Sequence, residues 1–529
     1  MKFESLSAKQ VLDIRILKMY FSILFLRLDS FAFSAVLILC YLFSSTAAAE
    51  IKLFPDSFSL QTLGYLKNET AYRYREPRSY TKIRNTLYLQ SRLELHRRLE
   101  FNFAGRAYYD AVYDLFDYDT ITARTLRDSD QPLVFVEGLA QEKDSNITEL
   151  RELYFDVFGD WADLRVGKQF IIWGVITGVR VVDEINPMDF KELITPKLLE
   201  YRIPLWSVKL DFYSKLANFE FIWIPELAFN KPAPRGSEWE LFQEVPGTAF
   251  PRSFDVRNPT LGDLKNTEVG AKITSTIFGN ELSVSYFYTW DDFPVLFRKV
   301  QLEQRPLVNG ADPADGEQGV VGAGGGSIEP PTFFPSYSRM HMLGGTFQRI
   351  IKGQILKGEA VAIKGKYFGI SPIDRDGDGY LDSQGVLQRY HVRLGLGVDF
   401  NVFKTEISPS FTQWIIYKYD EAIIQDKIDT SFNFFIRKTF SKRSAAFEML
   451  AIYLINLNEL YVKPQFSFRP SSQFEVTMGM DVFYGQKSQL GVVAVDGSPT
   501  DLLIVAQSTQ FIGNFNQNDR MFVEFKYSF

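Results

Sequence analysis

Apolar and polar residues alternate along most of the chain, one position at a time. From residue 87 to residue 95 the odd positions are mostly leucine, whereas the even positions are Tyr88, Gln90, Arg92 and Glu94. The same period recurs at 153–157, 164–166, 208–212, 282–288 and 392–400. A period of two is that of a β-strand with two different faces. One face of the predicted strands is apolar and aromatic, and the other carries charges and glycine.

The lengths of the strands and connections favour a membrane barrel over a soluble sandwich, which would also alternate with its apolar face inward. The strands are long, about 10–14 residues, which suits a tilted crossing of a bilayer better than the usual strand of about five to six. Short turns alternate with long loops at about 111–146, 172–204, 226–265, 291–339, 367–386 and 485–516. Short turns on one side and long loops on the other are typical of outer-membrane barrels.

The pattern predicts an all-β fold, a transmembrane antiparallel β-barrel of about 18 strands within a range of 16–18. The predicted strand cores are 57–66, 82–96, 98–110, 147–158, 161–171, 205–214, 216–225, 266–277, 281–290, 340–351, 354–366, 387–400, 403–416, 429–440, 446–455, 459–469, 473–484 and 517–529. Because lipid supplies no hydrogen bonds, the last strand must pair with the first.

The first 49 residues differ from the rest and read as a secretory signal peptide. Basic residues are followed by the uncharged apolar stretch 31–43 and by Ala47-Ala48-Ala49, which suits a cleavage site. An uncleaved anchor is the alternative, although the apolar stretch is short for a membrane span. Translation beginning at Met19 would give a leader of more usual length. The expected mature barrel is 50–529.

Composition excludes several other classes. Aromatic residues make up 15% of the chain, which is too many for a disordered protein. Cys40 is the single cysteine, so there is no disulfide framework. The formal net charge is −6, and nothing suggests the basic face that nucleic-acid binding needs. After residue 50 no uncharged apolar run is long enough for a membrane helix.

The chain ends in an alternating aromatic strand. Met521, Val523, Phe525, Tyr527 and Phe529 share one face. This end resembles the terminal signal that the outer-membrane barrel assembly machinery reads. The expected location is therefore the outer membrane of a Gram-negative bacterium, with membrane lipid and lipopolysaccharide around the barrel.

A motif follows the strand that ends near Ile171. Its residues are Gly167, Lys168, Gln169, Trp173, Gly174, Asp183, Ile185, Asn186, Pro187 and Asp189. Here the sequence resembles a family of Gram-negative outer-membrane proteins known as domain of unknown function 1302, distantly similar to alginate-export porins. The resemblance implies an outer-membrane barrel whose cargo is weakly defined, and it carries over no catalytic residues.

Charges in and before this motif suggest a pore constriction. The loop 172–204 holds Arg180, Asp183 and Asp189 at fixed spacing, and charges lining a pore select permeants. In the alternative interpretation, Arg180 pairs with Asp183 or Asp189 only to fix the loop, and both interpretations can hold together. Charges predicted to face the lumen on the neighbouring strands are Glu152, Asp156 and Arg165.

The loop 367–386 is a candidate calcium site, the one cofactor that the sequence suggests. Oxygen ligands recur at Asp374, Asp376, Asp378, Tyr380 (through its carbonyl) and Asp382, with Gly379 in the sixth position. Gly385 stands where an EF-hand has its bidentate Glu, so we expect weak binding with a structural role. A solvated acidic turn is the alternative. No other cofactor or metal is expected.

A glycine- and proline-rich stretch, 305–336, has neither the period of a helix nor that of a strand. Gating of the pore and a surface loop without a role are both open interpretations. No Gly-Lys-Ser/Thr follows its glycines, so it is not a phosphate-binding Walker loop.

Enzymatic chemistry is not expected. The chain has three histidines, His96, His341 and His391, and no Gly-x-Ser-x-Gly elbow. Only His341, with Ser336 and Ser338 nearby, resembles part of a nucleophile–base pair. The predicted function is passage of a solute, lipid or polymer across the outer membrane without chemistry. The alternatives are an export component docked to a periplasmic partner and a surface adhesin or structural barrel.

Overall fold

The fold was obtained as a computed structural model. It describes residues 49–54, 58–116, 121, 146–176, 178–234, 237–239, 264–299, 332–370, 385–440, 444–486, 490–494, 502–506 and 511–529. The predicted leader 1–49, apart from Ala49, and the predicted calcium ligands Asp374 to Asp382 lie outside these residues.

The first half of the described chain is mostly strand. Its strands are β1 (Ala49–Phe54), β2 (Phe58–Arg73), β3 (Ser79–His96), β4 (Leu99–Asp110), β5 (Asn146–Phe158), β6 (Ala162–Gln169), β7 (Leu205–Tyr213), β8 (Asn218–Ile224), β9 (Glu268–Ile277), β10 (Asn280–Trp290) and β11 (Val295–Lys299). Its short helices are α3 (Val112–Leu115), η1 (Phe190–Glu192), α5 (Leu198–Tyr201) and η2 (Leu264–Asn266).

The second half continues the same pattern. Its strands are β12 (Thr332–Ser336), β13 (Arg339–Ile351), β14 (Gln354–Gly369), β15 (Val386–Val402), β16 (Thr405–Tyr417), β17 (Ile428–Thr439), β18 (Ala445–Leu454), β19 (Glu459–Phe468), β20 (Phe474–Tyr484), β21 (Leu490–Ala494), β22 (Leu502–Ala506) and β23 (Arg520–Ser528). The 3₁₀ turn η4 (Gly513–Phe515) precedes the last strand.

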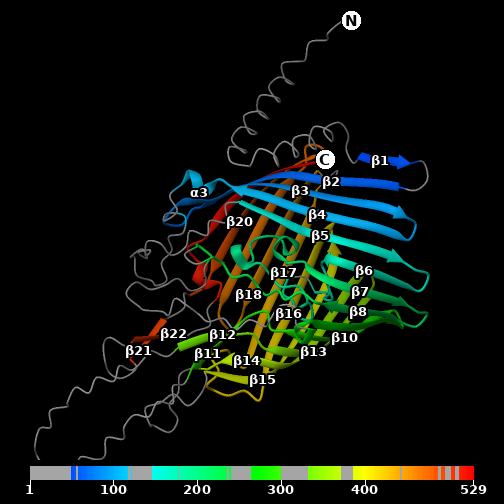
Figure 1. The fold of residues 1–529 in the computed structure, drawn as a ribbon. Coiled ribbons are helices and arrows are strands. Elements are labelled where there is room, and N and C mark those ends of the chain that lie inside the picture. Colours follow the sequence, from blue (N-terminus) through cyan, green and yellow to red (C-terminus); the bar gives the residue numbers. More distant parts are fainter. Residues whose placement is uncertain are drawn as a thin grey trace, which may run out of the picture.

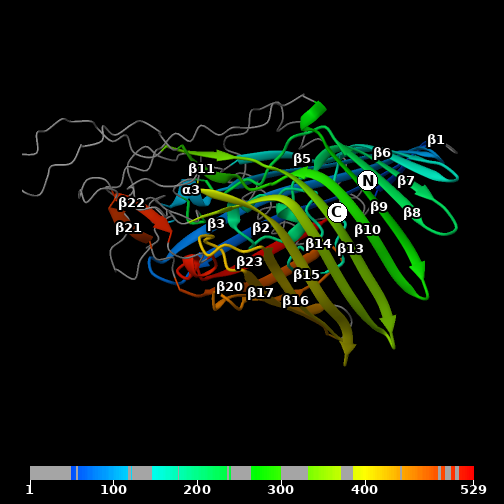
Figure 2. The ribbon, with the colours of Figure 1, turned by 90° about the horizontal axis from the view of Figure 1, so that it is seen from below.

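Eighteen of these strands form a closed antiparallel barrel. Neighbours in sequence pair from β2 to β10, from β10 to β13, and from β13 to β20, and β23 then pairs with both β20 and β2. The long strands run obliquely around a ring in two perpendicular views (Figures 1 and 2). The predicted fold, strand number and closure of last strand on first are confirmed. β1 is an additional strand, paired with the beginning of β2.

The outer face of the barrel is apolar and exposed. Val284, Leu343 and Leu396 are each 58–60% exposed and lie on alternate positions of β10, β13 and β15. In lipid every backbone polar group needs a partner within the protein, and a closed barrel provides one for each strand. The chain is therefore a bacterial outer-membrane barrel. No helix within the described ranges has the length and apolar character of a membrane span.

Short turns and long connections alternate as predicted. Where the structure describes the long connection 291–339, it contains the hairpin of β11 and β12, and the connection 485–516 contains the hairpin of β21 and β22. The short turns on the opposite side include Phe278-Gly279 and Lys352-Gly353, whose positive φ angles suit tight hairpin turns. The two ends of the barrel are thus unequal.

Gly167 allows β6 to approach β5 closely. Its φ is +139°, and an added Cβ would lie 2.1 Å from the carbonyl oxygen of Leu153 and 2.6 Å from the Cα of Tyr154. Both obstacles are backbone atoms, which no rotamer change can move. A glycine at this place in the motif thus has a steric reason.

We expect Gly167→Ala to lower the free energy of unfolding by about 1–3 kcal/mol, because the strands must separate to admit a methyl group. The measurement is the temperature at which the compact barrel is lost on a detergent gel. The matched control is Gly369→Ala, where the new Cβ would make only an ordinary 3.5 Å contact with Ile424. Equal stability of the two variants would contradict the steric explanation.

Candidate functional site

The connection between β6 and β7 folds into the barrel rather than over its rim. We call residues 170–204, except the undescribed residue 177, the inner segment. Its only regular structure is η1 and α5, each a single turn. Gly178, with a φ of +106°, and Asn186-Pro187 provide its sharp changes of direction. The inner segment lies within the ring of strands (Figure 1), where the predicted loop 172–204 was expected.

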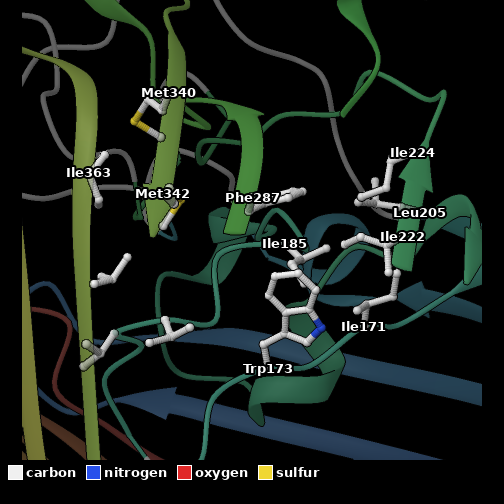
Figure 3. Packing of buried hydrophobic residues seen from close by; sticks show 13 residues of the cluster. Ile171, Trp173, Ile185, Leu205, Ile222, Ile224, Phe287, Met340, Met342 and Ile363 are labelled. Atoms are coloured by element: carbon white, nitrogen blue, oxygen red, sulfur yellow. The ribbon is translucent and has the colours of Figure 1, made fainter. Parts of the chain in front are cut away.

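An apolar cluster holds one side of the inner segment against the wall. Trp173, Ile171 and Ile185 of the segment pack with large side chains on the inner faces of β7, β8, β10, β13 and β14 (Figure 3). These wall residues are Leu205, Ile222, Ile224, Phe287, Met340, Met342, Val361 and Ile363. Besides the expected charges and glycine, the inner face of these strands also carries apolar side chains, because it contacts protein there instead of water.

Glu359, on the inner face of β14, binds the backbone of the inner segment. Its Oε1 accepts hydrogen bonds from the N–H groups of Val175 (2.5 Å) and Ile176 (2.6 Å), and its Oε2 accepts one from the N–H of Val182 (3.0 Å). Hydrogen bonds to a carboxylate are stronger than those to a neutral acceptor. One wall side chain thus accepts hydrogen bonds from three backbone N–H groups that lie outside any helix or strand.

Asp183 and Arg202 form a buried ion pair within the inner segment. Arg202 donates to the two carboxylate oxygens of Asp183 at 3.2 and 2.5 Å, and it has no exposed surface. Arg180 instead donates to the backbone carbonyls of Asp183 and Asn186, both at 3.1 Å. The geometry therefore gives Arg180 and Asp183 a role in fixing the segment. The carboxylate of Asp183 is paired with Arg202 and not with Arg180.

The remaining motif residues also hold this fold together. Asn186 accepts from the N–H of Ile171 at 2.8 Å and donates to the carbonyl of Ile203 at 2.8 Å, which joins the two ends of the inner segment. The carbonyl of Pro187 accepts from the N–H of Ile203. Asp189 caps η1 through the N–H of Lys191 at 3.2 Å.

The motif residues nearer to the strands contact the wall or its core. Trp173 donates through its indole to Glu220 on β8 at 2.5 Å, and an added Cβ on Gly174 would lie 3.0 Å from Asp183. Gln169 is fully buried and donates to the carbonyl of Ser207. Lys168 pairs in register with Trp206 and so lies on the outer face, unlike its neighbours.

Charged groups hold the opposite side of the inner segment. Glu192 forms ion pairs with Lys82 and Arg84 on β3 and lies 3.9 Å from Arg520 on β23. Glu200 pairs with Lys67 on β2 at 3.1 Å. Together with the contact of Glu359 on β14, these pairs show that the inner segment crosses the lumen from wall to wall.

Wall cations also satisfy carbonyl groups of the inner segment. Arg151 on β5 donates to the carbonyls of Leu199 (2.7 Å) and Arg202 (2.8 Å), and Lys463 on β19 donates to that of Thr195 (2.6 Å). Toward β15, Glu184 pairs with Arg393 at 2.7 Å. The inner segment is thus bound by side chains from most of the circumference.

The predicted lumen charges on β5 and β6 lie on the inner face. Arg165 makes a bidentate pair with Asp156, at 2.6 and 3.0 Å, and lies over the ring of Tyr154 at 4.1 Å. Glu152 is half-buried close to the same arginine. Arg165 therefore neutralises Asp156, and both signs of charge lie together on these strands.

A second segment, residues 511–515, enters the barrel next to the last strand. Glu459 at the start of β19 accepts hydrogen bonds from the N–H groups of Phe511, Ile512 and Gly513, between 2.9 and 3.1 Å. Phe515 and Trp239 then pack with Phe483 and with Leu193 of the inner segment. Glu459 therefore repeats on another strand the arrangement found at Glu359.

Sequence reasoning missed the wall residues that bind the inner segment. Glu359, Glu459, Arg393, Lys463 and Arg520 are each far from the motif in sequence. Their only signal is charge at inward positions of an alternating strand, and many other residues share it. Arg202 lies within the predicted loop, but nothing in the sequence marked it as the partner of Asp183.

The candidate calcium ligands lie outside the described residues, and the candidate catalytic residues Ser336, Ser338 and His341 lie within them. Within the described residues no cluster of His, Cys, Asp and Glu could hold a metal ion. His341 shares a hydrogen bond with the hydroxyl of Tyr286 at 2.8 Å on the outer face, and Ser338 is buried without a partner for its hydroxyl. The grouping of Ser336, Ser338 and His341 is therefore not a catalytic triad.

The contacts of Glu359 predict a looser inner segment in the variant Glu359→Gln. A neutral amide offers one acceptor oxygen and weaker hydrogen bonds, so three backbone N–H groups lose part of their stabilisation, about 1–3 kcal/mol in total. We expect larger and noisier single-channel conductance. Glu448→Gln is the matched control, because Glu448 binds only Arg437 and Gln465 on the wall. Identical conductance in both variants would count against a holding role for Glu359.

The environment of Glu192 predicts an acid-sensitive inner segment. Burial opposes its ionisation, but Arg84, Lys82 and Arg520 outweigh burial and hold the pKa of Glu192 well below its usual value. Its contribution is therefore complete above pH 4.5 and is lost as the pH falls below that value toward the lowered pKa. We expect conductance to change below pH 4.5, and Glu192→Gln to remove that change. An acid response that persists in Glu192→Gln would assign it to other groups.

Comparisons with known proteins give a family and a set of distant structural likenesses. OccAB4 of Acinetobacter baumannii has a TM-score of 0.44 with 9% identity, over 89% of this chain and 98% of that one. OccK2 (OpdF) of Pseudomonas aeruginosa, solved in complex with glucuronate, has 0.42 with 8%, over 89% and 97%. OmpF of Salmonella typhi, solved with daunomycin, has 0.35 with 8%, over 91% and 100%.

The family match is more extensive than the motif that suggested it. No curated protein matches the sequence. The likeness to alginate-export porins stays a prediction. Residues 35–361 match the family of proteins of unknown function DUF1302, which includes the whole inner segment. The chain belongs to this family.

Proposed function

We propose that the protein is a channel that passes small polar solutes across the outer membrane, through a lumen narrowed by the inner segment. The observation that carries this proposal is that the inner segment crosses the barrel and is bound on opposite walls, by Glu359 on β14 and by Lys82 and Arg84 on β3. A segment so placed limits the size of whatever passes. Rings of polar groups at a constriction also select among permeants.

The character of the lumen supports small polar solutes over lipid or polymer. Inner-face charges are arranged as pairs of both signs, as with Asp156 and Arg165 or Lys209 and Asp211 at 2.9 Å. A lipid chain would have to pass these hydrated groups, which is unfavourable. A polymer would need a wider opening than one crossed by a fixed segment. The proposal includes no chemistry.

The protein segments that occupy the lumen favour a second candidate function. In this candidate the barrel is closed by its own segments and serves as a structural or surface protein. Two inward segments, bound by Glu359 and Glu459, contribute to one apolar cluster, which includes Leu193 and Phe515. The two candidates differ in one measurable property, which is whether the intact barrel conducts.

Reconstitution in planar bilayers and liposomes tests the proposal. We expect the full mature chain to give small, steady conductance and to admit solutes of a few carbon atoms. Replacing residues 178–200 by a short Gly-Ser linker should raise conductance several-fold, because the constriction is removed. Glu359→Gln, a milder change, should raise it less. If the intact barrel passes neither ions nor ethylene glycol while the shortened one conducts, the closed structural barrel is correct instead.

A further inference from the structure

A small polar cleft lies between the inner segment and the wall strands β2, β20 and β23. Lys197 and Glu200 of the inner segment line one side of it. The wall side is lined by Tyr65, Lys67, Glu475, Thr477, Glu524 and Lys526. We call these eight residues the dipolar cleft, because they include three lysines and three glutamates.

Strand register explains how opposite charges come together on the wall. Lys526 is paired with Glu475 on one side and with Lys67 on the other. Two residues earlier on β23, Glu524 is paired with Thr477 and with Glu69. Because alternate residues of a strand share a face, Lys526 and Glu524 both face the lumen in adjacent rows, one with a positive and one with a negative charge.

Several of these charges have no ion-pair partner in the protein. Among the described residues Lys197, Glu524 and Lys526 form no ion pair within 4 Å and no side-chain hydrogen bond. Lys67 and Lys197 attract Glu524 from a greater distance, and Lys526 lies over the ring of Tyr65 at 4.6 Å. Lys67, by contrast, is bound by Glu69 at 3.2 Å and Glu200 at 3.1 Å. Several other cations of the inner face are in ion pairs, as Arg165 is with Asp156 and Arg393 with Glu184. The dipolar cleft therefore presents both signs of charge ready to bind a solute.

We propose that the dipolar cleft binds small zwitterionic solutes of the α-amino acid class as they pass the inner segment. This inference rests on the proposed channel function and names its substrate class. A solute carboxylate would bind Lys197 and Lys526, and its ammonium group would bind Glu524. Tyr65 and Thr477 supply hydroxyl groups beside them.

The arrangement disfavours solutes of a single charge. An anion drawn to Lys197 and Lys526 meets Glu524 in the same cleft, and a cation drawn to Glu524 meets the two lysines. When a solute with both charges binds, each of its charged groups loses water but gains a contact with an opposite charge of the cleft. Specificity of this kind comes as much from repulsion of the wrong solute as from attraction of the right one.

Uptake of three isosteric solutes into proteoliposomes of the full mature chain tests the proposal. Glycine carries both charges, glycolate only the carboxylate and ethanolamine only the ammonium group, and neutral ethylene glycol is the reference. Relative to ethylene glycol, we expect glycine to enter faster than either singly charged solute. Since one hydrated charge pair contributes modestly, the expected advantage is about twofold to fivefold.

Two variants separate the two ends of the solute. Lys197→Gln should slow glycine and glycolate relative to ethylene glycol, and Glu524→Gln should slow glycine and ethanolamine. Neither residue is in an ion pair, so neither variant leaves a charge unpaired in the protein. Lys357→Gln removes a lysine from the inner face of β14 outside the dipolar cleft. It also breaks the ion pair of Lys357 with Asp399, and it should still leave the order of the solutes unchanged.

The outcomes distinguish this inference from the function on which it rests. If ethylene glycol enters but the three charged solutes keep the same order in wild type, Lys197→Gln and Glu524→Gln, the zwitterion site is wrong and the channel stands. If no solute enters, ethylene glycol included, the channel itself is wrong. Opposite shifts of anion and cation uptake in the two variants would support the site, since a merely structural effect would slow all solutes alike.

Discussion

The hydrogen bonds of the backbone are the constraint on which this structure depends. In a bilayer each strand must pair on both edges, and the chain meets this condition by closing β23 on β2. Closure of 18 strands creates an interior wide enough to receive other parts of the chain. The inner segment that enters it has almost no regular structure, so its own N–H and C=O groups need partners as well. The wall supplies them with side chains.

The partners follow a simple division of chemistry. Wall carboxylates accept from N–H groups, as Glu359 and Glu459 do, and wall cations donate to carbonyls, as Arg151 and Lys463 do. Charged residues facing inward are therefore used to hold protein segments as well as to line a pore. This double use explains why charge on the inner face does not by itself identify the residues that a solute meets.

Alternation was enough to predict the barrel because each face of a strand has one kind of neighbour. The predicted core 429–440, for example, differs by one residue at each end from β17 (Ile428–Thr439). Alternation did not predict the places where the inner face contacts protein. At Met340 and Met342 the inner residues are apolar, and so is the neighbouring outer residue Leu343. Apolar residues on both faces indicate burial on both, so that signal was present. No such signal existed for the pairing of Asp183 with Arg202. The same is true of the bonds from Glu359 to Val175, Ile176 and Val182, because both depend on how a loop without a regular period folds.

The two sides of the inner segment differ in the kind of contact that they make with the wall. Toward β8, β10, β13 and β14 it packs largely through Trp173, Phe287 and other buried apolar side chains. Toward β2, β20 and β23 it is held by ion pairs such as Lys67 with Glu200. Water and polar solutes compete with such pairs far more readily than they enter an apolar contact. The channel that we propose therefore follows the charged side of the inner segment, where Lys197 and Glu524 form no close ion pair among the described residues.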